Sequence, residues 1–209
     1  MTKPEDAVRL AEIAASIAPV LKETGYSKRG HLWNRRLESG LVHVVEIDAG
    51  PRGWALPVSK VETEPLRYGS YVLEFGVYAA ELDFMDRGRA WIPAVACAVL
   101  GGMDDLTFGR GDGRLWPTSG DDEAAPALMR PGRPWASLWE DDAGAVAKSA
   151  MMSYGLPWLS RFVDHDDIVA AFLSGDSLGL VPPNRARIAK MLARLGRDDE
   201  ALEILDAAD

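Results

Sequence analysis

The run Leu41-Val-His-Val-Val-Glu-Ile-Asp48 decides the fold class, because it is rich in β-branched residues and follows a turn sequence. That turn is Glu38-Ser-Gly40, and an aromatic and basic stretch at about 31–38 precedes it. Two strand-like runs joined by a short turn containing glycine predict a β-hairpin. We therefore expect two neighbouring antiparallel strands within residues 31–48.

A third strand is predicted in the run Tyr71-Val-Leu-Glu-Phe-Gly-Val-Tyr78, which alternates in the manner of a half-buried strand. Residues 91–100 are apolar but short, so their pattern fits a strand or a helix equally. Glycine, aspartate and proline punctuate residues 101–134, which we expect to be mostly irregular, with one short strand near 106–108.

Helices are predicted on both sides of these strands. The first follows a capping box at Thr2 and Glu5 and ends near Gly25, with a kink or an early break at Pro19. The later ones are Trp135–Tyr154 closed by Gly155, Asp164–Leu173 started by capping carboxylates, and Pro183–Leu195 and Asp198–Ala207 joined at Gly196.

These elements predict an α+β fold with an N-terminal helix, an antiparallel sheet of three to five strands, and C-terminal helices ending in a helical hairpin. We expect residues 1–180 to form a single domain and residues 181–209 to form a hairpin packed on it. The hairpin looks like one unit of a tetratricopeptide array, but such arrays need about three copies. It is therefore interpreted as a cap on the main core.

Composition narrows the function classes. The 209 residues carry a net charge of -9, which argues against nucleic acid as a general partner, because phosphate binding needs clustered Lys and Arg. Charges interrupt residues 1–24, so no signal peptide is predicted, and no apolar run approaches the length of a membrane span. The single cysteine excludes an intrachain disulfide. We expect a cytoplasmic protein without membrane contact; no oligomeric state follows from the sequence.

Motifs for catalysis or metal binding are weak. Cys97 lies in an apolar run and is interpreted as a core residue. Asp164-His-Asp-Asp167 is explained better by helix capping than by a metal, and Gly109-Arg-Gly-Asp-Gly113 by a turn than by a phosphate cradle. We expect no catalytic residue, no metal and no cofactor. An alternative remains open in which Glu46 and Glu74 form a carboxylate pair for acid–base chemistry.

A basic stretch stands out in this acidic chain, and its candidate binding residues are Arg29, His31, Trp33 and Arg35. Arginine and tryptophan are enriched at binding hot spots, and arginine forms bidentate pairs with carboxylate or phosphate. The stretch is therefore a candidate contact for a partner or an anion. The competing interpretation, which the frequency of structural ion pairs favours, is that these cations neutralise the protein's own acids.

Three segments together resemble a known bacterial family. They are Leu21-Lys-Glu-Thr-Gly-Tyr26 with the basic strand that follows, the run Tyr71–Tyr78, and Tyr154-Gly-Leu-Pro-Trp-Leu159. They are similar to the family known as domain of unknown function 4304, over about residues 10–175. The resemblance implies a small α+β domain and carries over no catalytic residue. Small domains of this kind also occur among immunity proteins of bacterial toxin systems.

The sequence thus predicts a non-enzymatic intracellular binding protein whose partner is another protein. An immunity protein, or an inhibitor of a basic bacterial toxin, is the specific case, because an acidic surface speeds encounter with a basic partner. Two alternatives remain: a small hydrolase or transferase that uses Glu46 and Glu74, and a protein that binds an anionic small ligand at Arg29 and Arg35.

Overall fold

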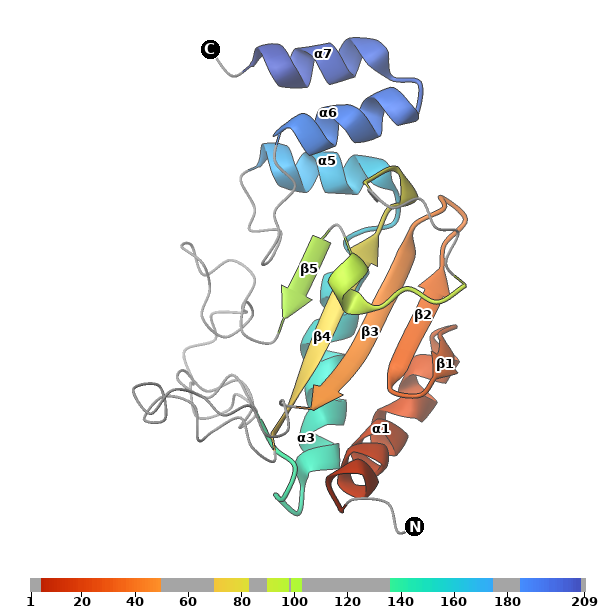
Figure 1. The fold of residues 1–209 in the computed structure, drawn as a ribbon, viewed down its shortest axis with the longest axis vertical. Coiled ribbons are helices and arrows are strands. Elements are labelled where there is room, and N and C mark those ends of the chain that lie inside the picture. The colour runs from red at the N-terminus through yellow and green to blue at the C-terminus, as the bar shows by residue number, and fades with distance from the viewer. Residues whose placement is uncertain are drawn as a thin grey trace, which may run out of the picture.

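The computed structural model describes residues 5–49, 70–82, 90–97, 99–102, 136–174 and 185–207. Within them lies an antiparallel sheet of order β1-β2-β3-β4-β5, with a sixth strand that pairs with β4. The strands are β1 (Ser27–Arg29), β2 (Leu32–Arg36), β3 (Val42–Ala49), β4 (Ser70–Tyr78), β5 (Val99–Gly102) and β6 (Ala136–Ser137). The expected α+β class, with helices before and after an antiparallel sheet, is confirmed (Figure 1).

The predicted hairpin is present as β2 and β3, with Arg35 opposite His43 and Leu32 opposite Glu46. Its turn contains Gly40 at a φ of 90°, a backbone conformation that glycine adopts without strain. β3 pairs along its whole length with β4, so that Glu46 lies opposite Glu74. The other edge of β4 is shared by β5 and β6.

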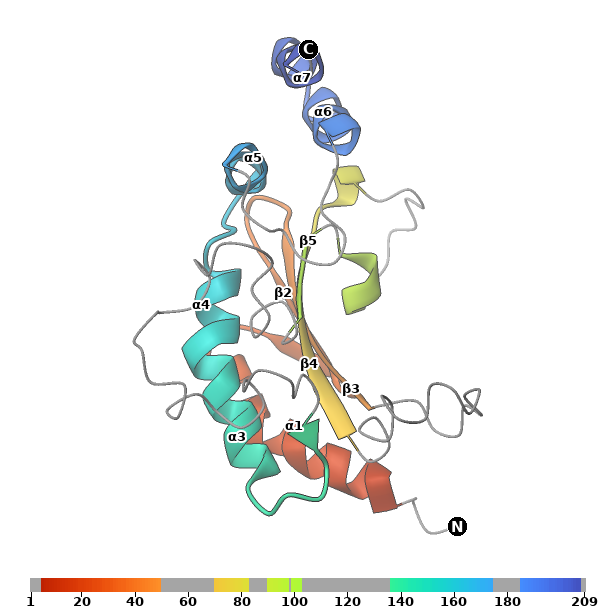
Figure 2. The ribbon, with the colours of Figure 1, turned by 90° about the vertical axis from the view of Figure 1, so that its left-hand side faces the viewer.

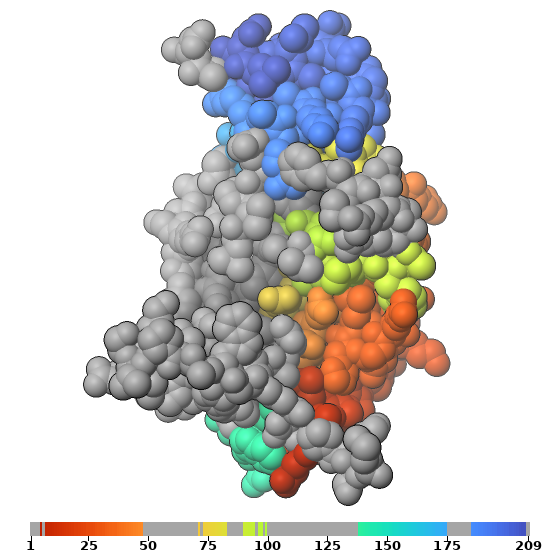
Figure 3. Space-filling model, viewed as in Figure 1, coloured from red at the N-terminus to blue at the C-terminus, as the bar shows by residue number. Residues whose placement is uncertain are grey.

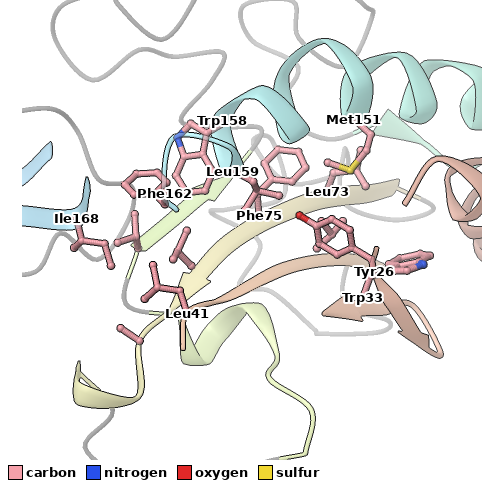
Figure 4. Close-up of a cluster of buried hydrophobic side chains, with 14 of the residues drawn as sticks. Tyr26, Trp33, Leu41, Leu73, Phe75, Met151, Trp158, Leu159, Phe162 and Ile168 are labelled. Atoms are coloured by element: carbon pink, nitrogen blue, oxygen red, sulfur yellow. The ribbon is translucent and has the colours of Figure 1, made fainter. Parts of the chain in front are cut away.

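One face of the sheet is covered by helices α1 (Glu5–Glu23), α3 (Ala143–Ala150) and α4 (Leu156–Leu159) (Figure 2). The largest fully buried side chains on this side include Trp33, Phe75 and Phe162 (Figure 4). Tyr71 belongs to the same cluster, and its hydroxyl donates to Ala143 O. Burying a side chain of this size contributes about 1.5–3 kcal/mol each. This layer is therefore the main hydrophobic core.

The opposite face carries a second, smaller cluster. Residues 90–97 lie across it and form a 3-10 turn, η4 (Ala94–Ala96), before the chain enters β5. The apolar stretch at 91–100 is thus neither one helix nor one strand. The cluster buries Val42, Val44, Tyr78, Ile92, Ala94 and Cys97.

Helix α1 continues through Pro19, so the early break expected there as the alternative to a kink is absent. Pro19 and Ala15 are both exposed, so the carbonyl that loses its helical hydrogen bond faces water. The helix ends in a Schellman motif: the N–H of Tyr26 donates to Leu21 O, and the N–H of Gly25 donates to Lys22 O. Gly25 has the expected positive φ of 88°.

The helix expected over Trp135–Tyr154 is shorter at its start and longer at its end. Residues 136 and 137 belong to β6, and α3 begins only at Ala143. Gly155 does not close it, because a π-helical turn over Met151–Gly155 leads directly into α4. Gly155 is needed for close packing instead: a Cβ there would lie 2.6 Å from Cε1 of Phe75.

The C-terminal helices α5 (His165–Leu173), α6 (Arg185–Arg194) and α7 (Asp198–Asp206) stack at one end of the molecule (Figures 1 and 2). The predicted capping at the start of α5 is present: Asp164 accepts hydrogen bonds from the N–H groups of Asp166 and Asp167, and Asp167 accepts from that of Asp164. Gly196, at a φ of 75°, separates α6 from α7. The short strand expected near 106–108, the Gly109–Gly113 turn and the capping box at Thr2 lie outside the described residues.

Candidate functional site

The basic stretch forms the border of the sheet. Lys28 and Arg29 occupy β1, His31 lies in the two-residue turn, and Trp33 and Arg35 occupy β2. Directly opposite residues share a face, so Lys28 stands with Trp33, whereas Arg29 stands with Leu32 on the reverse face. The four residues predicted to bind are therefore close in space, but Arg29 points away from Trp33 and Arg35.

Trp33 belongs to the core, because only 1% of its surface is exposed. Its ring supports the ammonium group of Lys28, whose Nζ lies 4.9 Å from the ring centroid. The indole Nε1 is buried and has no hydrogen-bond partner among the described residues. Trp33 thus positions Lys28 by a cation–π contact rather than offering an exposed aromatic surface.

Arg35 lies near the end of α1, with its Nε within 3.8 Å of the place where a Cβ on Gly25 would stand. A cation near a helix C-terminus is favourable. Its charge also acts on His43, whose pKa is lowered mainly by burial and further by Arg35, against a hydrogen bond to Phe162 that raises it. Burial and the charge of Lys28 lower the pKa of His31 in the same way.

The cations of this border are not paired with acids of the described residues. Neither Lys28, Arg29 nor Arg35 forms an ion pair with any carboxylate in the part of the chain that the structure describes. All three side chains are exposed. The geometry therefore favours a contact surface over internal charge balance.

The two glutamates of the enzymatic alternative lie on neighbouring strands. Glu46 and Glu74 lie directly opposite each other on β3 and β4, and both are half-buried. However, Oε2 of Glu46 accepts a hydrogen bond of 2.8 Å from the N–H of Ala94, which ties down the segment above the sheet. Burial raises the pKa of the nearby Cys97 thiol well above its ordinary value, and the two carboxylates raise it further. A neutral thiol of this kind is a poor nucleophile.

Asn34 is a structural residue that the sequence did not single out. Its side-chain amide donates to Ile92 O at 2.9 Å and accepts from Ile92 N at 2.7 Å, as a neighbouring strand would. It therefore holds residues 90–97 against the sheet. The only sequence signal is a polar residue in a strand that is otherwise basic or apolar.

His165 also has a structural role. Its Nε2 lies 2.9 Å from Oε2 of Glu81, in the 3-10 turn η3 (Ala80–Leu82) that follows β4. The carbonyl groups of Glu81 and Leu82 accept hydrogen bonds from Arg194 and Arg187 of α6. Among the described residues, no group of three or more His, Cys, Asp and Glu side chains is placed to hold a metal ion.

A small hollow of about 210 Å³ lies between α1 and the turn before α3. Its polar lining is mostly acidic: Arg9, Glu12, Ser16, Glu140, Asp141 and Asp142. Arg9 is paired with Glu12 at 3.2 Å, and Oγ of Ser16 lies 2.7 Å from Gly144 O. Arg9, Glu12 and Ser16 therefore have partners within the protein.

The outer flank of α7 is a surface that the sequence analysis missed. Leu202 and Leu205 are 58% and 45% exposed, whereas Ala201 and Ile204 are buried against α6. Helical spacing places Leu202 and Leu205 on one flank beside Asp198 and Asp206. We call these four residues the α7 flank. A signal was present, since two leucines fall outside the apolar face set by Ala201 and Ile204.

The charges of the hairpin are segregated. Helix α7 carries five carboxylates and no cation, and α6 carries four cations and no carboxylate. Two cations of α6 bind main-chain carbonyl groups: Arg185 donates to Ile204 O, and Arg194 donates to Glu81 O. Arg197, between the helices, pairs with Asp166 of α5 and with Glu200. Asp198 and Asp206 of the α7 flank make no such pair with any described residue.

Comparison of the chain with models of protein families, with curated proteins and with solved structures finds no match. None of the described helices has both the length and the apolar character of a membrane span.

Proposed function

We propose that this chain is a non-enzymatic protein-binding domain that takes a basic partner on the α7 flank. The observation that carries the proposal is the exposure of Leu202 and Leu205 among carboxylates that have no cationic partner in the described part of the chain. Exposed apolar side chains rimmed by one sign of charge are typical of a contact surface.

The position of α7 supports this proposal. It is the outermost helix of the α5, α6, α7 stack and forms one end of the molecule (Figure 3). In stacked helical hairpins each unit buries one face against its neighbour, and the outer face of the last helix has no neighbour. Such a terminal face is usually polar. Here that face retains two leucines. A helix or loop with apolar residues flanked by Lys or Arg has the complementary chemistry.

A net charge of -9 adds a long-range attraction for such a partner. This attraction weakens as the salt concentration rises. An inhibitor of a basic bacterial toxin, acting in the cytoplasm, is the specific form of this function that we propose. The enzymatic alternative has weaker support, because Glu46 accepts a hydrogen bond from Ala94 and burial keeps the Cys97 thiol neutral.

The test is affinity purification from the native cell with three tagged forms of the full chain. These are the wild type, a variant with Leu202→Gln and Leu205→Gln, and a control with Val8→Gln and Met152→Gln, which changes two exposed apolar residues elsewhere. We expect a basic protein to be retained by the wild type and the control, to be lost from the α7 variant, and to elute with salt. Equal retention by all three forms would refute the proposal.

A further inference from the structure

The outer strand of the sheet offers a second surface, distinct from the α7 flank. β1 stands at the border of the sheet and pairs only with β2 within the described residues (Figure 1). Its three side chains are exposed. An outer strand with a free edge can accept another extended segment as a further strand.

The chemistry of this edge is cationic on both faces. Lys28 stands on the face of Trp33, and Arg29 stands on the face of Leu32. Lys28 is held over the ring of Trp33 on β2, so its ammonium group has a fixed position on this face. Arg35 adds a further cation on the same face as Lys28. None of the three is paired with a carboxylate of the described residues.

We propose that the β1 edge binds an extended acidic segment of a partner protein. Consecutive residues of an added strand point to opposite faces of the sheet. Two adjacent carboxylates in that strand would therefore meet Lys28 on one face and Arg29 on the other. The segment recognised is an extended one with neighbouring Asp or Glu residues.

A peptide fits this surface better than nucleic acid does. The edge is three residues long, and the chain as a whole carries a charge of -9. A polynucleotide places phosphates well beyond so short an edge, where it meets the repulsion of the remaining acids. A competing role for the two cations is to prevent edge-to-edge aggregation, since charged residues on short outer strands do this. That role predicts no binding.

The experiment uses the full chain and a short fluorescent peptide with a central Asp-Glu pair between threonine and valine residues. A control peptide carries Asn-Gln instead. At low salt we expect the acidic peptide to bind more tightly than the control and to shift the amide signals of Ser27–Arg29 in nuclear magnetic resonance spectra. Each exposed ion pair contributes roughly two- to fivefold in affinity. Lys28→Gln with Arg29→Gln should therefore weaken binding roughly four- to twenty-fivefold.

The matched control is Lys148→Gln, which removes an exposed cation on α3. It should leave affinity within about twofold, as expected for a charge remote from the site. Amide shifts confined to other strands, or equal losses in the Lys148 variant, would overturn the proposal. So would tighter binding of a single-stranded oligonucleotide to the same amides. The wild-type shifts decide the matter even where the double variant fails to fold.

Discussion

The imidazole Nε2 of His43 lies 2.7 Å from the main-chain carbonyl oxygen of Phe162, and this buried hydrogen bond joins β3 to the turn between α4 and α5. A carbonyl oxygen can only accept, so Nε2 carries the proton. Nδ1 then faces the hydroxyl of Tyr26 at 3.5 Å as an acceptor. His43 thus connects the sheet to the start of the helical stack that presents α7.

Replacing His43 with leucine should lower the free energy of unfolding by about 1–3 kcal/mol, because the buried carbonyl of Phe162 loses its partner. The matched control is Tyr26→Phe, which removes only the longer contact and should cost less than about 1 kcal/mol. Urea unfolding measures both. A loss for Tyr26→Phe as large as that for His43→Leu would contradict the assigned hydrogen bond.

Stability should fall as the pH falls below about 6.5, the ordinary pKa of histidine. His43 and His31 both have a lowered pKa in the folded protein, mainly through burial. Between the unfolded and the folded pKa the unfolded chain binds more protons, so acid favours unfolding. Their contribution is complete above about pH 6.5 and is lost below it.

The measurement is the urea midpoint at a neutral and at a mildly acidic pH, for the wild type and for a variant with His31→Gln and His43→Gln. The variant should show a smaller change between the two pH values. A wild-type urea midpoint that rises on acidification would contradict the predicted effect of both histidines.

Gly155→Ala should destabilise the protein although alanine is the better helix former. The new Cβ would stand 2.0 Å from Cε of Met151 and 2.6 Å from Cε1 of Phe75. Overpacking of this kind costs about 1–3 kcal/mol, which exceeds a gain in helix propensity of up to about 1 kcal/mol. Ser153→Ala, on the exposed side of the same turn, should stay within about 0.5 kcal/mol. A stabilising Gly155→Ala would disprove the close packing of this turn on β4.

Asp206→Asn should have opposite effects on stability and on partner binding. Asp206 ends α7, where a carboxylate opposes the helix dipole, so its removal should raise stability by a few tenths of a kcal/mol. If Asp206 borders the partner site, the same change should weaken partner association, and salt should matter less for the variant. Glu38→Gln, which removes an exposed acid in the turn between β2 and β3, is the control. Association unchanged by Asp206→Asn but weakened by Glu38→Gln would place the partner elsewhere.

Elements set by local pattern could be predicted, and features set by distant contacts could not. The strand at 42–49 follows from its β-branched residues, and the strand at 70–78 follows from alternation. The start of α5 follows from its capping carboxylates. The role of Gly155 depends on Phe75, 80 positions earlier, and the place of residues 90–97 depends on the amide of Asn34.

The candidate site shows the same division. Composition marked the cations at 28–36 as unusual, but it did not show that Trp33 is buried beneath Lys28. The exposure of Leu202 and Leu205 depends on which side of α7 packs on α6, and a single amphipathic pattern leaves that open.

The central claim is that the partner binds the α7 flank, and amide hydrogen exchange of the purified complex tests it most directly. We predict that exchange slows over Asp198–Asp206 when the basic partner is bound, and that α3 and α4 are unchanged. Slowed exchange confined to the strands around Glu46 and Glu74, with α7 unaffected, would contradict the account and favour a site on the sheet.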